Sequence, residues 1–413
     1  MKPDMSRHLR LLATALLCLA LPISQTQSQT APSRRAQAYF PERLDWQHKT
    51  PAEVGMNGAA IDEAVKAAIA NESAAPRDLM LAHAISYGRE PYDSPIGPIK
   101  SRGPASGLII HKGYIVAEWG EPKRVDMTFS VTKTFLTTLV GLAWQRGLIR
   151  NLDEPARAYM PGGAPTLEDG ALFEAEHNQK ITWDHLLRQT SDWQGTLWGK
   201  PDWADRPVGQ QPKDWLNRPL HEPGTFFKYN DVRVNVLALA ALHVWRKPLP
   251  DVLREEVMEP IGASNGWRWH GYDNAWIELD GKRVQSVTGG GHWGGGMFID
   301  AYDMARFGYL FLRNGKWKDK QIIAEDWIQK ARSPGPASAN YGFANWYLNN
   351  AVENRKPLPA APTSAVRFVG NGNNIVYIDW ENDVIIVARW VNDDRGLNAI
   401  VEKTLASLGA KRK

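Results

Sequence analysis

Runs of β-branched and aromatic residues lie near both ends of this 413-residue chain, with a helix-rich stretch between them. The first two runs, 106–110 and 114–119, flank a glycine-containing turn at 111–113, which is typical of a β-hairpin. Comparable runs return near the other end, at 366–370, 375–379 and 384–390. A lone hairpin is only marginally stable in water. We therefore predict one antiparallel sheet built from both chain ends.

The middle of the chain has a different pattern. Helical stretches are predicted at 181–189, 232–246 and 251–260, and loops rich in Trp, Pro and Gly at 193–226 and 262–285. The predicted fold class is α/β (α+β): a helix-flanked sheet domain formed by 31–149 and 297–413, with an inserted, mostly helical domain at 150–296.

Several connecting segments also carry predictions. Residues 31–55 read as a flexible lead-in, and 82–104 as a long surface loop. The run 289–296, which contains His292 between two glycine triplets, predicts a flexible turn. A helix is expected over 301–312, with a final one over 397–408.

The first thirty residues are typical of a secretory signal peptide. A positively charged start precedes an apolar run at 11–23 that is too short to span a bilayer, and a small, polar stretch follows it. The single cysteine, Cys18, lies inside this run, so the mature chain would have no thiol chemistry and no disulfide. We therefore expect a periplasmic or secreted protein without an integral membrane span in its mature form.

Residues 128–147 contain the most informative motif. Apolar residues repeat there at helical spacing, Gly147 is a suitable stop, and Ser130 stands at the N-cap or first turn. Lys133 follows one helical turn later, which places its amine near the Ser130 hydroxyl. This is the only Ser-x-x-Lys in the chain.

A serine hydroxyl becomes a useful nucleophile when a neighbouring base takes its proton, and a lysine can do so if its amine is partly neutral. The start of a helix adds backbone N–H groups that can stabilise an oxyanion. Four residues match such a pattern easily by chance, so an ordinary N-cap serine beside a solvated lysine is the competing interpretation.

A mechanism of this kind needs a second proton-transfer group and a second oxyanion donor. Tyr229, in the loop before the predicted helix at 232–246, is the candidate phenol, and Asp231 is a polar neighbour. The glycine-rich segment 368–374 is the candidate donor, although a plain turn between strands fits it equally well. His292 is a possible pocket residue, with an exposed loop histidine as the alternative.

Other chemistries find less support. The chain has no Gly-x-Ser-x-Gly elbow, no helical zinc spacing of histidines, no phosphate-binding glycine loop and no basic, aromatic-rich nucleic-acid surface. The net charge of +4 is mild. Four loop tryptophans could either wall an apolar substrate cleft or belong to the core, namely Trp193, Trp198, Trp203 and Trp293.

With these motifs in order, the chain resembles the serine β-lactamase-related hydrolases. This superfamily includes class C β-lactamases, D-alanyl-D-alanine carboxypeptidases, family VIII esterases and 6-aminohexanoate-dimer hydrolases. Ser130-Val-Thr-Lys133 resembles its first motif, and Pro223 to Asp231 its second, with Asp231 in place of an asparagine. Residues 181–191 resemble a further family stretch, from which Gln189 and the following Asp192 depart.

The third family motif, Lys-Thr-Gly or His-x-Gly, is altered. The matching positions look like Phe368-Val369-Gly370, so the cation that grips a substrate carboxylate is absent. The resemblance implies that the backbone N–H groups of Ser130 and Asn371 form the oxyanion hole, beside Gly370.

The resemblance implies an exported serine hydrolase that cleaves a carboxylic ester or amide through an acyl-enzyme intermediate. Its catalytic residues would be Ser130, Lys133 and Tyr229. No metal and no organic cofactor is implied, and the expected partner is a small-molecule substrate rather than nucleic acid. The alternative is a catalytically weak penicillin-binding-like module that recognises cell-wall peptides.

Overall fold

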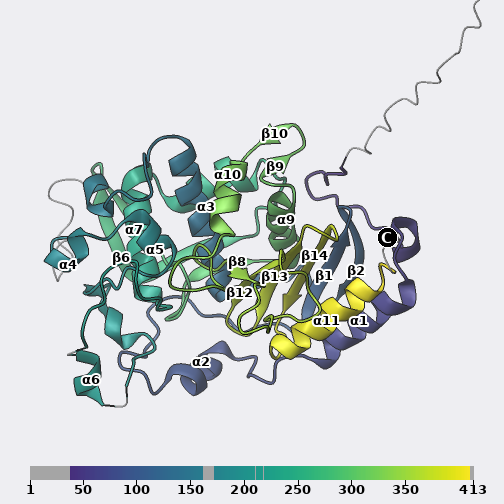
Figure 1. Cartoon of the computed structure of the whole chain (residues 1–413), viewed down its shortest axis with the longest axis horizontal. Helices are drawn as coiled ribbons and strands as arrows, with labels where there is room; N and C mark the ends of the chain where they lie inside the picture. Colours follow the sequence, from purple (N-terminus) through teal and green to yellow (C-terminus); the bar gives the residue numbers. More distant parts are fainter. Residues whose placement is uncertain (1–37, 161–171, 210, 217, 410–413) are drawn as a thin grey trace, which may run out of the picture. The chain divides into compact units, whose positions relative to one another are not determined.

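The computed structural model describes residues 38–160, 172–209, 211–216 and 218–409, which belong to one compact unit. Its main sheet is antiparallel and has the strand order β11-β12-β13-β14-β1-β2 (Figure 1). Strands β1 and β2 come from the first part of the chain, and β11 to β14 from the last. The predicted fold class, with a sheet built from both chain ends, is confirmed.

The strands have these bounds: β1 Ser106–His111, β2 Tyr114–Trp119, β3 Asp126–Met127, β4 Thr196–Leu197, β5 Lys200–Pro201, β6 Arg268–Leu279, β7 Lys282–Val287, β8 Gly296–Ile299, β9 Lys316–Trp317, β10 Lys320–Gln321, β11 Tyr347–Leu348, β12 Val366–Gly370, β13 Asn374–Asp379 and β14 Val384–Arg389. The α-helices are α1 Gly58–Ala70, α2 Leu79–Tyr87, α3 Thr132–Gln145, α4 Glu176–Gln179, α5 Trp183–Leu187, α6 Pro212–Leu216, α7 Asp231–Trp245, α8 Leu249–Leu253, α9 Ala301–Leu312, α10 Glu325–Ala331 and α11 Asp394–Ala406.

The central strands are buried on both faces because helices cover both sides of the sheet. Strands β1 and β14 join the two chain ends, with Ile109 opposite Ile386, and every residue of both strands is buried. Helices α1 and α11 pack side by side on one face, and α9 packs on the other (Figure 1). Such continuous apolar strands are expected when neither face meets water.

Helix α3 is buried along almost its whole length. Its residues from Thr132 to Ala143 are all inaccessible to solvent, including Lys133. Phe135 stacks on Phe307 of α9, with ring centroids 3.9 Å apart. The predicted helix is confirmed, and its position between the sheet and the helical region fixes whatever stands at its first turn.

The prediction of a loop at 262–285 was wrong. Strands β6 and β7 form a hairpin there. They belong to a second, four-stranded sheet with the order β3-β8-β6-β7. The pairing of β6 with β7 shifts register between Gly271 and Trp276, where Asp273 and Asn274 interrupt the apolar pattern. A bulge of this kind hides the period-two signal on which a strand prediction depends.

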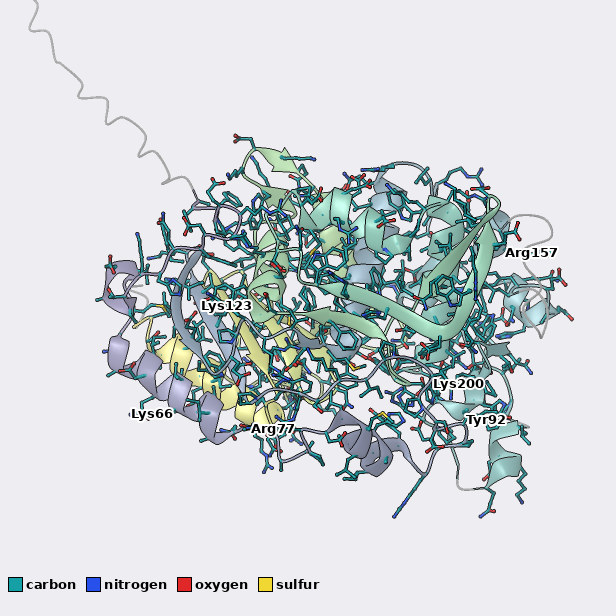
Figure 2. All side chains as sticks on the ribbon, turned by 180° about the vertical axis from the view of Figure 1, so that it is seen from behind. Lys66, Arg77, Tyr92, Lys123, Arg157 and Lys200 are labelled. Carbon is teal, nitrogen blue, oxygen red and sulfur yellow. The ribbon has the colours of Figure 1, made fainter. Side chains whose placement is uncertain are left out.

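Two further segments are more ordered than predicted. The predicted loop 82–104 begins inside helix α2, and the predicted flexible lead-in includes Trp46, which is buried and donates a hydrogen bond to the Gly113 carbonyl (2.7 Å). Lys200 fixes the stretch after α2 by donating to the carbonyls of Tyr92 (2.6 Å) and Ser94 (2.7 Å) (Figure 2).

The predicted signal peptide lies outside the described residues. In the part of the chain that the structure describes, no helix is both long and apolar enough to cross a membrane.

A buried arginine joins the two sheets near the start of α3. Arg389, at the end of β14, donates to the carbonyls of Ile299 on β8 (2.6 Å) and Met127 on β3 (3.0 Å). It also donates to the side chain of Asn374 (2.9 Å). Buried carbonyls without a hydrogen-bond partner cost free energy, so the Arg389 guanidinium stabilises the contact between the two sheets. Residues 128–133, which include Ser130 and Lys133, follow directly after Met127 at this contact.

We expect Arg389→Met to lower the free energy of unfolding by about 3 kcal/mol, because it leaves these buried acceptors without a donor. Urea denaturation would measure the change. Arg395→Met is the matched control, since the Arg395 side chain is 93% exposed, and it should change stability little. Equal effects of the two substitutions would contradict the assigned role of Arg389.

Candidate active site

Ser130 lies in a 3-10 turn, Phe129–Val131, which leads directly into α3. It therefore stands just before the helix rather than at its N-cap, and it is 8% exposed. The preceding residue, Phe129, has φ +50°, a left-handed conformation that is unfavourable for a bulky side chain. Its ring packs edge-on against Trp390 at 6.4 Å, and this packing holds the turn.

The Lys133 amine joins the hydroxyl to a carboxylate. Lys133 Nζ lies 2.7 Å from Ser130 Oγ and 2.7 Å from Asp231 Oδ1. The side chains of Lys133 and Asp231 are 0% and 1% exposed. Ser130 and Lys133 are three residues apart, in the 3-10 turn and in the first turn of α3. Asp231 is the first residue of α7, so its contact with Lys133 depends on the packing of α3 against α7.

The surroundings of Lys133 shift its protonation equilibrium towards the neutral amine. Burial lowers the pKa of the Lys133 amine, and the nearby Arg206 guanidinium lowers it further, although Asp231 opposes both effects. Burial alone would raise the pKa of Asp231, but Lys133 and Arg206 hold it well below its usual range. A carboxylate that stays charged beside an amine that can lose its proton is suited to proton transfer near neutral pH.

Arg206 and Asp205 are part of this network, and the sequence analysis did not find them. Arg206 Nη1 donates to Asp231 Oδ2 (3.1 Å) and to Asp205 Oδ1, and the Asp231 backbone N–H donates to Asp205 Oδ2. Arg206 has φ +50°, so its backbone is strained where its side chain meets the network. Two adjacent charges in a loop rich in Trp and Pro were the only signal available in the sequence.

Tyr229 contacts the same amine through the face of its ring. Lys133 Nζ lies 4.7 Å from the ring centroid, and the Arg206 guanidinium carbon lies 5.0 Å from it. Burial, followed by the effects of Tyr347, Asp231 and Tyr341, raises the pKa of the Tyr229 phenol well above its ordinary value. A phenol with a raised pKa keeps its proton in the resting site, so it has a proton to give, although it is a weaker acid than a free phenol.

The loop that carries Tyr229 is held by a residue that departs from the family pattern. Gln189 Oε1 accepts from the Asn230 backbone N–H (2.6 Å), and Gln189 Nε2 donates to the Tyr341 hydroxyl (2.8 Å). Asn230 caps α7 by accepting from the Arg233 N–H. Gln189 thus connects the start of α7 to a second phenol on the wall of the site.

Strand β12 passes directly against the backbone of the nucleophile turn. A Cβ atom on Gly370 would stand 1.9 Å from the Thr128 carbonyl oxygen and 3.2 Å from the Ser130 nitrogen, so only glycine fits there. Asn371 follows in the exposed turn between β12 and β13, and its side chain accepts from the Gly372 N–H (3.0 Å). The end of β12 is therefore next to Ser130, where the resemblance places the second oxyanion donor.

The predicted flexible turn at 289–296 is instead buried against the network. Its glycines allow close approach: a Cβ on Gly290 would lie 1.6 Å from Asp231 Oδ1 and 2.1 Å from Lys133 Nζ. His292 is also buried, so the interpretation of it as an exposed loop histidine was wrong. Its Nε2 lies 2.8 Å from Glu90 and 3.9 Å from Asp205, which places it behind the network.

Three further positions from the sequence analysis, Trp193, Trp293 and Phe368, are buried in the core. Trp193 and Trp293 are 2% and 0% exposed and belong to the core rather than to a cleft wall. Phe368 is also buried and packs against Trp346, with centroids 4.9 Å apart. The altered position of the third motif therefore offers no cation to the site.

Comparisons with known proteins show the family and the fold of this chain. The Beta-lactamase family model matches residues 109–408. A penicillin-binding protein homologue from Caulobacter crescentus is 15% identical, with 85% of this chain and 97% of that one covered and a TM-score of 0.54. A family VIII carboxylesterase is 16% identical (86% and 99% covered, TM-score 0.53). EstCE1, a hydrolase with promiscuous acyltransferase activity, is 18% identical (84% and 99% covered, TM-score 0.52).

We expect Gly290→Ala to reduce kcat by about 100-fold, because the added methyl group must displace the Lys133–Asp231 pair by an ångström or more. Ester hydrolysis would measure the loss, and circular dichroism would show whether the fold is retained. Gly58→Ala is the control, since a Cβ there meets nothing within 4 Å. Full activity in Gly290→Ala would show that the pair tolerates displacement.

The pH dependence of kcat/KM should move in opposite directions in two variants. If Lys133 acts as the neutral base, its pKa sets the acidic limb of the profile. Asp231 raises that pKa, so Asp231→Asn should move the limb to lower pH. Arg206 lowers it, so Arg206→Gln should move the limb to higher pH. Shifts in the same direction, or none, would contradict this assignment.

Proposed function

Because this chain belongs to the Beta-lactamase family, we propose that it is an exported serine hydrolase that cleaves a carboxylic ester or amide through an acyl-enzyme intermediate. The observation that carries the proposal is the hydrogen-bonded series Ser130–Lys133–Asp231, in which a buried amine with a lowered pKa touches the serine hydroxyl. An N-cap serine beside a solvated lysine would not show this burial.

In the acylation step, Ser130 Oγ attacks the substrate carbonyl carbon as neutral Lys133 takes the hydroxyl proton. The resulting ammonium is stabilised by Asp231, which is already charged and 2.7 Å away. The carbonyl oxygen becomes an oxyanion, for which the backbone N–H groups of Ser130 and Asn371 are the proposed donors. The approach of Gly370 to the Ser130 nitrogen supports this placement.

Collapse of the tetrahedral intermediate breaks the ester or amide bond and needs a proton on the leaving oxygen or nitrogen. Tyr229 is the proposed donor because its phenol stays protonated and its ring lies against Lys133. The Lys133 ammonium then restores the phenol proton, so the net charge of the site is unchanged. In the second half of the cycle, water attacks the acyl carbon as Lys133 accepts its proton. The acyl–Oγ bond then breaks, the acid product leaves, and Lys133 returns the proton to Ser130 Oγ.

The altered third motif supports esters and simple amides over β-lactams. β-Lactams and D-alanyl peptides carry a carboxylate that a cation on this strand would grip. Phe368 provides none, and Arg206 is already paired with two carboxylates. Export is proposed from the signal-like pattern of residues 1–30.

A substrate panel tests this preference. We expect short-chain p-nitrophenyl esters to be hydrolysed with a kcat/KM at least about tenfold above that of nitrocefin, which is the difference that one lost charged hydrogen bond can produce. Efficient nitrocefin turnover with weak ester cleavage would overturn the preference while leaving the serine mechanism in place.

Covalent labelling separates an enzyme from a binding module. An activated phosphonate should label the wild-type protein stoichiometrically, and mass spectrometry should place the adduct on Ser130. Ser130→Ala should abolish labelling and reduce kcat by about ten-thousand-fold. Another buried serine, Ser191, serves as the control in Ser191→Ala. Absent labelling, with tight binding of cell-wall peptides, would favour the penicillin-binding-like alternative.

A further inference from the structure

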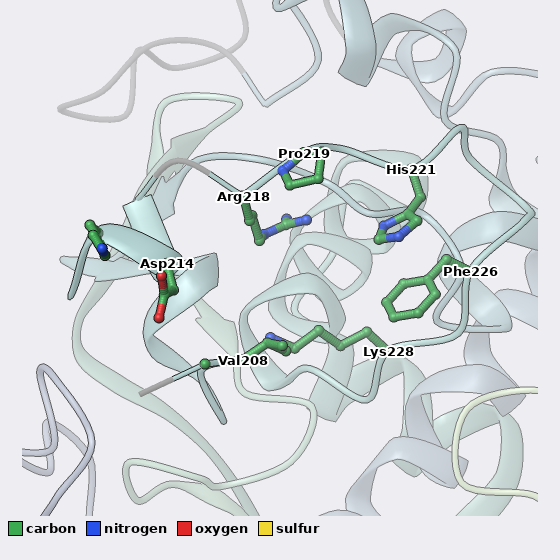
Figure 3. A pocket seen from close by; sticks show the side chains of 9 residues that line it. Val208, Asp214, Arg218, Pro219, His221, Phe226 and Lys228 are labelled. Atoms are coloured by element: carbon green, nitrogen blue, oxygen red, sulfur yellow. The ribbon is translucent and has the colours of Figure 1, made fainter. Parts of the chain in front are cut away.

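A cavity lies on the α6 side of the loop that carries Tyr229, and none of the proposed catalytic residues lines it. Its volume is about 560 Å³, within the range of small-molecule sites. Figure 3 shows His221 and Phe226 together on one side and Asp214 on the other, with the Lys228 side chain extended between them.

The cavity has an exposed apolar wall. Val208 is 61% exposed and Phe226 is 38% exposed, and Leu216, at the end of the neighbouring helix α6, is 61% exposed. Phe226 stacks on His221 with ring centroids 3.9 Å apart and an interplanar angle of 14°, which gives this wall a flat, ordered surface. Clustered exposed apolar side chains beside a cavity are typical of a ligand-binding surface.

Two of the basic side chains in the lining, Arg218 and His221, already have carboxylate partners. Arg218 donates to Asp192 (2.8 Å) and to Asp202 (3.0 Å). His221 lies 3.2 Å from the same Asp192 carboxylate. Both side chains are therefore held by buried acids behind the cavity wall.

Lys228 differs from both. Among the residues that the structure describes, no carboxylate lies within ion-pair distance of its amine, although the side chain is half-buried. Burial lowers the pKa of Lys228, and the neighbouring guanidinium of Arg233 lowers it further. A bound anion would offset both effects. The one acidic side chain of the lining, Asp214, accepts from the Gln211 N–H and lies on the opposite side.

We propose that this cavity binds a small monocarboxylate with an apolar chain. The carboxylate would pair with the Lys228 amine, and the chain would lie against Phe226 and Val208, away from Asp214. An anion without an apolar part would leave the apolar wall exposed, and an uncharged molecule would leave Lys228 without a partner. A ligand with both a negative charge and an apolar chain therefore fits the cavity.

This site is independent of the proposed hydrolase reaction, because no bond is made or broken in it and Ser130 takes no part. Isothermal titration calorimetry on Ser130→Ala would therefore measure it without turnover. With octanoate as the probe we expect saturable binding of one molecule per chain. Acetate lacks the apolar chain and 1-octanol lacks the charge, so each should bind at least tenfold more weakly than octanoate.

Substitutions at the two ends of the ligand complete the test. In the Ser130→Ala background, Lys228→Gln and Phe226→Ala should each weaken octanoate binding at least tenfold, and Lys228→Arg should retain most of it. Lys66→Gln, an exposed lysine of α1, should have no effect. Circular dichroism would confirm that each variant is folded. Equal octanoate affinity in Lys228→Gln and Lys66→Gln, or no saturable binding, would overturn the proposal.

Discussion

The contact on which the account depends is a buried amine shared between a hydroxyl and a carboxylate. An isolated lysine in a protein interior would either lose its proton or destabilise the fold. Asp231 makes the charged form tolerable, whereas burial and Arg206 make the neutral form accessible. The amine is thus held between two protonation states, and this balance is what a base for Ser130 requires.

The fold supplies this contact from parts of the chain that are far apart in sequence. The turn before α3 provides the hydroxyl, α3 the amine and α7 the carboxylate, and β12 lies on the side where an oxyanion would form. Gly290 and Gly370 allow the backbone to approach where any side chain would collide. Arg389 fixes the two sheets on which these elements stand.

Local pattern was sufficient for the elements with strong periodicity. The helix at α3, the strands of the two chain ends and the helix at 301–312 all have the predicted type, because burial imposes the same period on sequence and structure. The hairpin β6–β7 was missed because its bulge interrupts the period-two pattern. The role of Arg206 and the burial of His292 could not be predicted, since both depend on contacts between residues far apart in sequence, 25 positions for Arg206 and Asp231 and 202 for His292 and Glu90.

The protonation equilibrium of Lys133 is the most direct measurement of the central claim. Lysine labelled with ¹³C at Cε can be titrated by NMR, and the Lys133 signal assigned by its loss in Lys133→Arg. The account predicts that this one signal titrates well below the exposed lysines and moves further down in Asp231→Asn. A Lys133 signal that titrates with the exposed lysines, near the ordinary value of about 10.4, would contradict it.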